Sequence, residues 1–287
     1  MSSIETSDGI KLNYLESGSG EPLFLIHGLT ANLNYFKKQI PVLSQKYRVI
    51  AYDLRGHGLS EASKGLTLER YAQDLEEIMD HFEIRKTSVV CWSMGAHVLF
   101  EYIRNCTCER LGKIVIIDMS PKLLKAADWR FGLAGASGKP GDFGHEDNLS
   151  VLAAMCRDWD AYSRVVAERI LMRPAASEKL RSGLEASFKG KEDLPWIYEQ
   201  SRLNNPFVIV SMWISMAMKD YRPVLPGITV PCLLTYGTES NYYGPDNYEY
   251  MKSQIPDASI LPFEGCGHAL HIQEPDKFNN AVMDFIK

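Results

Sequence analysis

Ser93 is the residue whose surroundings point most directly to chemistry. It lies in Cys91-Trp92-Ser93-Met94-Gly95, directly after an apolar run, 87–90, that predicts a short buried strand. Apolar residues at helical spacing follow it, so a helix is expected next. A serine between strand and helix, with small residues two positions away on each side, has the layout of a nucleophile elbow. The turn would lift the Ser93 hydroxyl clear of the sheet, and the N–H of Met94 at the helix start would face developing negative charge.

A possible base for this serine lies far along the chain. His268 ends the segment Phe263-Glu264-Gly265-Cys266-Gly267-His268, a glycine-bearing loop that follows the last predicted strand. A serine nucleophile needs a base to take its proton, and the base needs a carboxylate to orient it. We therefore expect His268 to be the base. His27 and His57 are expected to brace loops, and His97 to be a packed helix position.

The elements that position these groups alternate between strand and helix. The predicted strands are 22–26, 47–52, 87–90, 113–117, 230–236 and 258–262. The predicted helices are 35–45, 68–82, 98–106, 246–255 and 275–286, with Thr67 as an N-cap of the second. This alternation predicts an α/β fold with a mostly parallel central sheet and helices on both faces. Reactive groups in such a sheet gather at the carboxyl ends of its strands.

The alternation stops between residues 122 and 205. This stretch reads as helices and loops, so we expect a helical cap insertion at 122–205 over a core formed by 1–121 and 206–287. Its tryptophans and methionines would either line a substrate pocket or form a small core of the insertion, and the sequence leaves both open. The apolar character of the insertion favours an uncharged, partly hydrophobic substrate.

Composition excludes several classes of protein. The chain has 287 residues, 45% hydrophobic and 23% charged, which is typical of a globular protein with a large core. Its net charge of −5 argues against nucleic acid as a partner. No apolar run reaches the length of a membrane span, and residues 1–9 lack the apolar core of a signal peptide. We therefore expect a cytoplasmic protein with no membrane partner; its oligomeric state is not indicated.

The six cysteines are scattered and are expected to be reduced thiols. Cys106 and Cys108 have no second pair at zinc spacing. His268 and His271 are three residues apart, but no third ligand lies near them in the sequence. We expect neither a metal nor a cofactor.

Four segments in the same order resemble those of the α/β-hydrolase family. They are Leu25-Ile26-His27-Gly28, the segment from Asp53 to Ser60 (Asp-Leu-Arg-Gly-His-Gly-Leu-Ser), the elbow at Ser93, and Gly265-Cys266-Gly267-His268 followed by Glu274-Pro275. The resemblance covers about residues 9–287 and is to capped, single-domain members. It implies Ser93 as nucleophile, His268 as base, and an oxyanion hole from the N–H groups of Leu29 and Met94.

The acid departs from the common family pattern, in which an aspartate closes a Gly-x-x-Asp turn after the penultimate strand. Here the turn is Gly237-Thr238-Glu239-Ser240, and serine stands in that place. Some branches, among them zearalenone-lactone hydrolases and pancreatic lipases, are similar in needing their acid one strand earlier, where this chain has Asp118. We therefore favour Asp118, with Glu239 as the alternative acid and Asp246 as a third candidate.

The expected function is hydrolysis of a small-molecule carboxylic ester or lactone through an acyl-enzyme. A serine at 93 rather than an aspartate argues against the dehalogenase and epoxide-hydrolase branches, which form an ester on a carboxylate. Three alternatives stay open: a C–C bond hydrolase that uses the same triad, a cofactor-free oxygenase, which resembles this chain in the place of its aspartate, and a non-catalytic ligand receptor.

Overall fold

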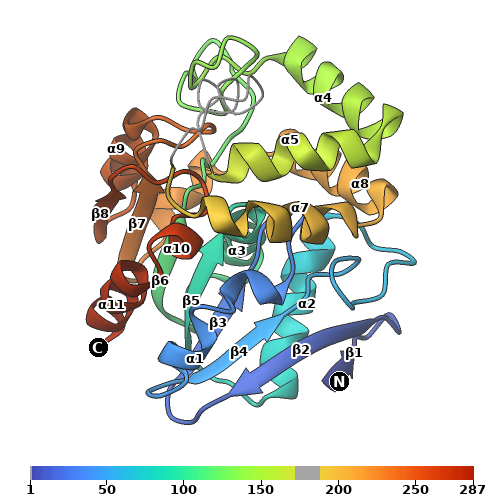
Figure 1. Cartoon of the computed structure of the whole chain (residues 1–287). Helices are drawn as coiled ribbons and strands as arrows, with labels where there is room; N and C mark the ends of the chain where they lie inside the picture. Colours follow the sequence, from blue (N-terminus) through green and yellow to red (C-terminus); the bar gives the residue numbers. More distant parts are fainter. Residues whose placement is uncertain (1, 172–187) are drawn as a thin grey trace.

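An eight-stranded sheet forms the centre of this computed structural model, which describes residues 2–171 and 188–287 (Figure 1). The strand order is β1-β2-β4-β3-β5-β6-β7-β8. Strand β1 pairs with β2, and β2 with β4, in antiparallel orientation, and all other neighbouring strands are parallel. The strands are β1 (Ser2–Glu5), β2 (Lys11–Ser17), β3 (Pro22–Ile26), β4 (Arg48–Tyr52), β5 (Thr87–Trp92), β6 (Leu111–Ile117), β7 (Cys232–Gly237) and β8 (Ala258–Phe263). The predicted α/β class with a mostly parallel sheet is confirmed.

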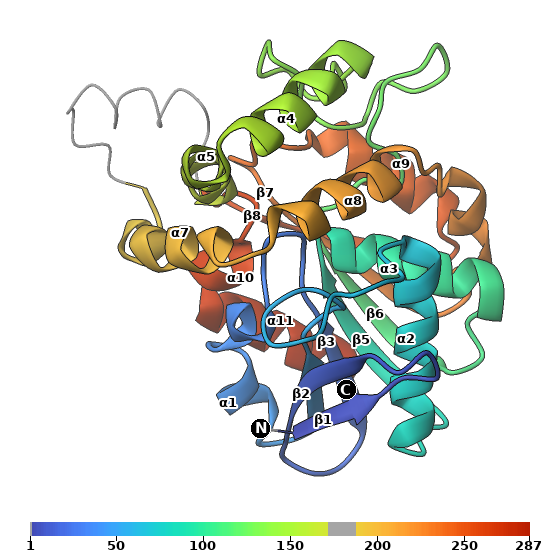
Figure 2. The ribbon, with the colours of Figure 1, turned by 90° about the vertical axis from the view of Figure 1, so that its right-hand side faces the viewer.

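Helices cover both faces of the sheet, as Figure 2 shows from the side. One face carries α2 (Leu68–His81), α3 (Met94–Cys106) and α9 (Pro245–Gln254); the other carries α1 (Ile40–Leu43), α10 (Leu270–Gln273) and α11 (Pro275–Ile286). The predicted N-cap of α2 is present, because the Thr67 hydroxyl accepts a hydrogen bond from the Arg70 N–H at 3.3 Å. No helix in the described ranges is both long and apolar enough to cross a membrane.

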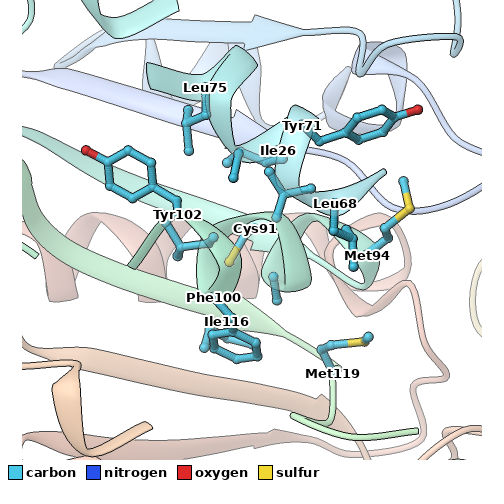
Figure 3. Close-up of a cluster of buried hydrophobic side chains, with 14 of the residues drawn as sticks. Ile26, Leu68, Tyr71, Leu75, Cys91, Met94, Phe100, Tyr102, Ile116 and Met119 are labelled. Carbon is cyan, nitrogen blue, oxygen red and sulfur yellow. The ribbon is translucent and has the colours of Figure 1, made fainter. Parts of the chain in front are cut away.

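The two core layers follow from the alternation of side chains along each strand. In β5, Val89 and Cys91 pack in the layer with α2 and α3, whereas Val90 and Trp92 pack in the opposite layer. Figure 3 shows the first layer, where strand residues such as Ile116 meet side chains of α2 and α3. Both faces of the inner parallel strands are thus buried, which explains why they appear in the sequence as continuous apolar runs, whereas the edge strand β8 is partly exposed.

Two features differ from the sequence-based expectations. The N-terminal strands β1 and β2 were not predicted; they lie at the antiparallel edge of the sheet, and β2 is largely half-exposed. The prediction of one helix over 35–45 is wrong. A 3-10 turn, η1 (Leu33–Phe36), is followed by the single α-helical turn α1, with Pro41 at its start. Proline lacks the N–H that a continuous helix through this position would need.

Four helices lie together above the carboxyl ends of the strands, in the upper part of Figure 1. They are α4 (His145–Arg157), α5 (Trp159–Leu171), α7 (Leu194–Arg202) and α8 (Pro206–Ala217). The short 3-10 turn η2 (Lys191–Asp193) directly precedes α7, and η3 (Arg222–Gly227) leads from α8 to β7. Helices α4, α5 and α7 fall in the insertion predicted at 122–205, of which residues 172–187 lie outside the described residues. Helix α8, placed by the prediction in the core segment 206–287, packs against both α4 and α2.

Candidate active site

The parallel strands bring the predicted reactive residues together at the carboxyl ends of the strands. Strands β5 and β6 pair in register up to Trp92 and Ile117, so Ser93 and Asp118 leave the sheet side by side. The Ser93 N–H donates to the carbonyl oxygen of Ile117 at 3.0 Å, which fixes the two strand ends to each other. His268 reaches these strand ends from the loop that follows β8.

Ser93 has the strained backbone of a sharp turn between β5 and α3. Its φ and ψ angles are 53° and −124°, in a region that residues other than glycine rarely adopt. The small residue two positions later is required sterically, because a Cβ on Gly95 would collide with the carbonyl oxygen of Ile26. Trp92 and Met94 are buried but Ser93 is only partly so, and its side chain lines a pocket above the sheet. The turn therefore exposes a hydroxyl that its neighbours do not cover.

Asp118 and His268 are joined by a short hydrogen bond. The Nδ1 of His268 lies 2.5 Å from Oδ2 of Asp118, and both side chains are almost completely buried. The carboxylate holds the Nδ1 side of the ring, which leaves Nε2 as the ring nitrogen that can serve the pocket. His268 lines the same pocket as Ser93. This is the arrangement that a base and its orienting acid require.

The other two acid candidates occupy different positions. Glu239 follows β7, and its backbone N–H donates to the carbonyl oxygen of Cys266 at 2.8 Å. Asp246 lies in the first turn of α9. Of the three carboxylates considered from the sequence, Asp118 is the one that the structure shows hydrogen-bonded to His268.

Two hydroxyl groups that the sequence analysis did not single out also bind Asp118. The Ser240 hydroxyl donates to Oδ2 at 2.6 Å, and the Tyr248 hydroxyl donates to Oδ1 at 2.5 Å. Burial, reinforced by the nearby Asp118 charge, raises the pKa of Tyr248 well above its usual value, so this phenol stays a donor. With His268 they give the buried carboxylate three donors, and it needs such partners because it is removed from water.

The histidine loop is also held by the strand that carries the serine. The indole N–H of Trp92 donates to the carbonyl oxygen of His268 at 3.0 Å. The Tyr242 ring covers the imidazole, with ring centroids 4.4 Å apart. The residue before Ser93 therefore binds the backbone of His268, which couples the positions of the two groups.

The loop after β3 approaches Ser93 closely from the other side. A Cβ on Gly28 would lie 2.9 Å from the Cβ of Ser93, so only glycine fits there without movement. The next residue, Leu29, lines the pocket, and Thr30 has a positive φ of 63°. Met94 is the first residue of α3, whose N-terminal N–H groups carry partial positive charge. The two residues whose N–H groups are expected to bind an oxyanion are thus direct neighbours, one of Ser93 in the chain and the other of Gly28, which lies against Ser93.

The pocket above Ser93 is lined mainly by apolar side chains from the core and from the helices over it. Tyr162, Val166 and Ile170 of α5 and Trp213 of α8 contribute to its wall. The remaining lining residues are Leu29, Thr30, Trp92, Ser93, Leu123, Leu133, Phe143, Val151, Met155, Arg169, Met216, Tyr242, Tyr243 and His268. Among the described residues of 122–205, Met155, Phe143 and Tyr162 therefore line the pocket, whereas the three tryptophans of this stretch, Trp129, Trp159 and Trp196, are not among its lining residues.

Three other buried histidines, His27, His57 and His97, bind backbone groups, as expected of bracing residues. His27 accepts a hydrogen bond from the Leu54 N–H at 2.9 Å and donates to the Gly28 carbonyl oxygen at 2.8 Å, and burial lowers its pKa to about 4. His57 contacts the Arg55 carbonyl oxygen at 3.1 Å, and His97 that of Ser120 at 2.8 Å. Burial lowers the pKa of His57 to about 3 and that of His97 to about 4, so these rings are neutral near pH 7.

Comparisons with known proteins agree with this architecture. The chain is 24% identical over 286 residues to a non-heme chloroperoxidase from Kitasatospora aureofaciens, covering 98% of both chains. It is 23% identical over 268 residues to the esterase YbfF of Escherichia coli, covering 93% of this chain and 94% of the relative. Among solved structures, an esterase from Exiguobacterium antarcticum superposes with a TM-score of 0.85 at 22% identity, covering 99% of this chain and 98% of that one.

A family model described as the alpha/beta hydrolase fold matches residues 21–275. This range contains each of the strands from β3 to β8 and every residue of the Ser93, Asp118 and His268 cluster. The resemblance drawn from four short segments thus extends over most of the sequence and over the whole fold. The chain belongs to the α/β-hydrolase family.

Proposed function

We propose that this protein is a serine hydrolase that cleaves a small-molecule carboxylic ester or lactone. Ser93 is the nucleophile, His268 the base and Asp118 the acid that orients it. The hydrogen bond between Asp118 and His268, beside an apolar pocket that His268 and Ser93 both line, is the observation on which the proposal depends. The esterase relative adds support at the level of reaction class.

In the first half-reaction, the Ser93 oxygen attacks the carbonyl carbon while Nε2 of His268 takes its proton. The tetrahedral oxyanion accepts hydrogen bonds from the N–H groups of Leu29 and Met94, and each is worth roughly 3 kcal/mol at good geometry. The imidazolium, stabilised by Asp118, then protonates the departing alcohol. In a lactone this alcohol stays attached to the acyl group.

In the second half-reaction, water replaces the alcohol. His268 removes a proton from the water as it attacks the acyl-enzyme carbonyl, and the second tetrahedral intermediate collapses to release the acid and restore the Ser93 hydroxyl. The helices of 122–205 act as a cap in this proposal. They supply the apolar pocket wall that excludes bulk water from the reacting carbonyl.

A panel of 4-nitrophenyl esters and lactones, together with a fluorophosphonate probe, tests the proposal. We expect turnover of at least one substrate and covalent labelling of the wild type. Ser93→Ala should lose both, whereas Ser253→Ala, which removes an exposed hydroxyl on α9, should keep both. Failure of the probe to label Ser93 would contradict the nucleophile assignment and favour a ligand receptor.

A diketone-like substrate added to the panel, together with an oxygen electrode, separates the two other enzymatic alternatives. A C–C bond hydrolase would cleave a diketone-like substrate through the same residues and leave simple esters untouched. An oxygenase would consume oxygen during turnover, which an oxygen electrode records. Ester cleavage that proceeds at an unchanged rate under anaerobic conditions would exclude the oxygenase for this activity.

A further inference from the structure

One charged side chain lies on the face of α5 that forms the pocket wall. Tyr162, Val166, Arg169 and Ile170 all line the pocket, and their spacing places them on the same side of the helix. Three of these residues are the apolar or aromatic types expected at such a surface. In the described part of the pocket wall, Arg169 alone carries a permanent charge.

Arg169 is not needed to cap its own helix. The last carbonyl groups of α5 already have donors from the core: the Asn241 amide binds the Arg169 oxygen at 3.0 Å, and the Ala269 N–H binds the Ile170 oxygen at 3.1 Å. The Gln273 amide binds the Leu171 oxygen at 2.9 Å. These contacts satisfy groups that an arginine at a helix C-terminus often serves, so a capping role does not account for the guanidinium.

The same contacts fix Arg169 relative to the reacting groups. Asn241 follows Ser240, which donates to Asp118, and Ala269 follows His268, so the end of α5 is bound to the loop that contacts Asp118 and to the loop that carries His268. The guanidinium carbon lies 5.9 Å from the centroid of the Tyr242 ring, which in turn covers the His268 ring. Arg169 is therefore held near the imidazole by the helix end and by one tyrosine.

Most other arginines in the described ranges have carboxylate partners, and the exceptions, Arg85, Arg130 and Arg157, are exposed to solvent whereas Arg169 is half-buried. Arg55, for example, binds Asp74 at 2.6 Å and Asp8 at 2.8 Å, and Arg222 binds Asp220 at 2.6 Å. Within the described residues, the guanidinium of Arg169 has its contact with Tyr242 and no carboxylate within ion-pair distance. A half-buried guanidinium in an apolar pocket is stabilised by an anion, and its planar donors match both oxygens of a carboxylate.

We propose that Arg169 binds a free carboxylate of the substrate. The substrate is then a half-ester or lactone that carries an anionic group on an aliphatic chain. This inference rests on the proposed function, because it assigns the substrate class of the same site. The apolar character of the insertion alone favoured an uncharged substrate, and the inference changes that expectation. The aliphatic chain of the substrate contacts the apolar pocket wall, and its terminal carboxylate contacts the guanidinium of Arg169.

Two matched esters test the inference through turnover. Mono-4-nitrophenyl adipate carries a terminal carboxylate where 4-nitrophenyl hexanoate has a methyl group. Arg169→Gln should lower kcat/KM for the adipate by about 10- to 100-fold, the value of a hydrogen-bonded charge pair, and should lower the hexanoate value by a much smaller factor. The control Arg164→Gln removes an exposed arginine of the same helix, and both esters should keep their wild-type values.

Adipate itself provides a second readout that does not require turnover. It should raise the melting temperature of the wild type and of Ser93→Ala, but not that of Arg169→Gln, and neutral adipamide should have no effect on any of them. Equal losses on both esters, or unchanged adipate binding in Arg169→Gln, would overturn the inference. If no ester is cleaved while adipate binding still depends on Arg169, the proposed function fails and the anion site stands.

Discussion

The hydroxyl of Ser240 lies 2.6 Å from Oδ2 of Asp118, the same oxygen that binds His268. Ser240 occupies the turn after β7 where the family pattern has its acid. In this chain the proposed acid, Asp118, stands one strand earlier, at the end of β6, and the serine in the usual place donates a hydrogen bond to it. The side chains of residues 118 and 240 thus lie together beside the imidazole of His268, so the acid assignment can be tested by substituting either residue.

The first prediction concerns the acid itself. Asp118→Asn keeps the size of the side chain but removes its charge. The imidazolium then loses the carboxylate that stabilises it, and the neutral imidazole is no longer held in the tautomer that accepts a proton at Nε2. We expect kcat for the best ester to fall by up to ~10⁴-fold. Glu239→Gln is the matched control and should change kcat little. Loss of turnover in the Glu239 variant alone would transfer the acid role to that residue.

A second prediction follows from the convergence of Ser240 with Asp118. Asp118→Ser combined with Ser240→Asp exchanges the two side chains and returns the carboxylate to the usual turn, within reach of the same nitrogen of His268. Turnover should recover by about tenfold or more over Asp118→Ser alone, because one charge–imidazole contact is restored. Single-turnover assays of the three variants would show this. A double variant no faster than Asp118→Ser would mean that the two positions are not interchangeable.

The role of Tyr248 gives a third prediction. Tyr248→Phe removes the donor to Oδ1 of Asp118 and leaves the buried carboxylate with two donors. The free energy of unfolding should fall by about 1–3 kcal/mol, the cost of leaving a buried acceptor unpaired. Tyr250→Phe on the same helix is the control, and chemical denaturation is the measurement. Equal stabilities of the two variants would show that water replaces the lost hydroxyl.

The glycines around Ser93 give a fourth prediction. Gly28→Ala places a Cβ 2.9 Å from that of Ser93, and Gly95→Ala forces one against the carbonyl oxygen of Ile26. Each should destabilise the protein by about 1–3 kcal/mol, as overpacking does in a close-packed core, and each should displace the nucleophile. Gly227→Ala meets no atom within 4 Å and is the control. Activity and melting temperature unchanged in Gly95→Ala would argue against the tight elbow.

The buried histidines give a fifth prediction, on stability and pH. Burial lowers the pKa of His27 and His97 from 6.5 to about 4, and that of His57 and His271 to about 3. Below pH 6.5 the unfolded chain therefore binds more protons at these sites than the folded one, and stability rises with pH in that range. We expect the free energy of unfolding to be constant above pH 7 and to fall as the pH decreases from about 6.5 toward 4.

Urea denaturation at pH 7 and pH 5 would measure the effect. Each fully buried histidine whose pKa falls from 6.5 to about 4 can lower the free energy of unfolding by up to about 3 kcal/mol once the pH is below both values. His97→Gln should flatten the dependence, and His145→Gln, which alters an exposed histidine, should leave it unchanged. The same stability of the wild type at both pH values would contradict the prediction.

Local sequence patterns predicted most of the strands and helices, the elbow at Ser93 and the glycine loop that carries His268. Each of these is written in residues that are neighbours in the chain, because side-chain periodicity and turn chemistry act over a few positions. The same local signals failed at β1 and β2, whose side chains are too exposed to show a clear pattern, and at 35–45, where Pro41 interrupts an otherwise helical composition.

Which carboxylate contacts the imidazole, and which groups hold that carboxylate in place, became visible in the folded chain. Asp118 lies 150 residues from His268, 122 from Ser240 and 130 from Tyr248 in the sequence. Arg169 reaches the same pocket from helix α5. Contacts at such separations arise from strand order and register, which bring the carboxyl ends of distant strands together. No local pattern encodes them, because each side chain is compatible with many partners until the sheet selects one.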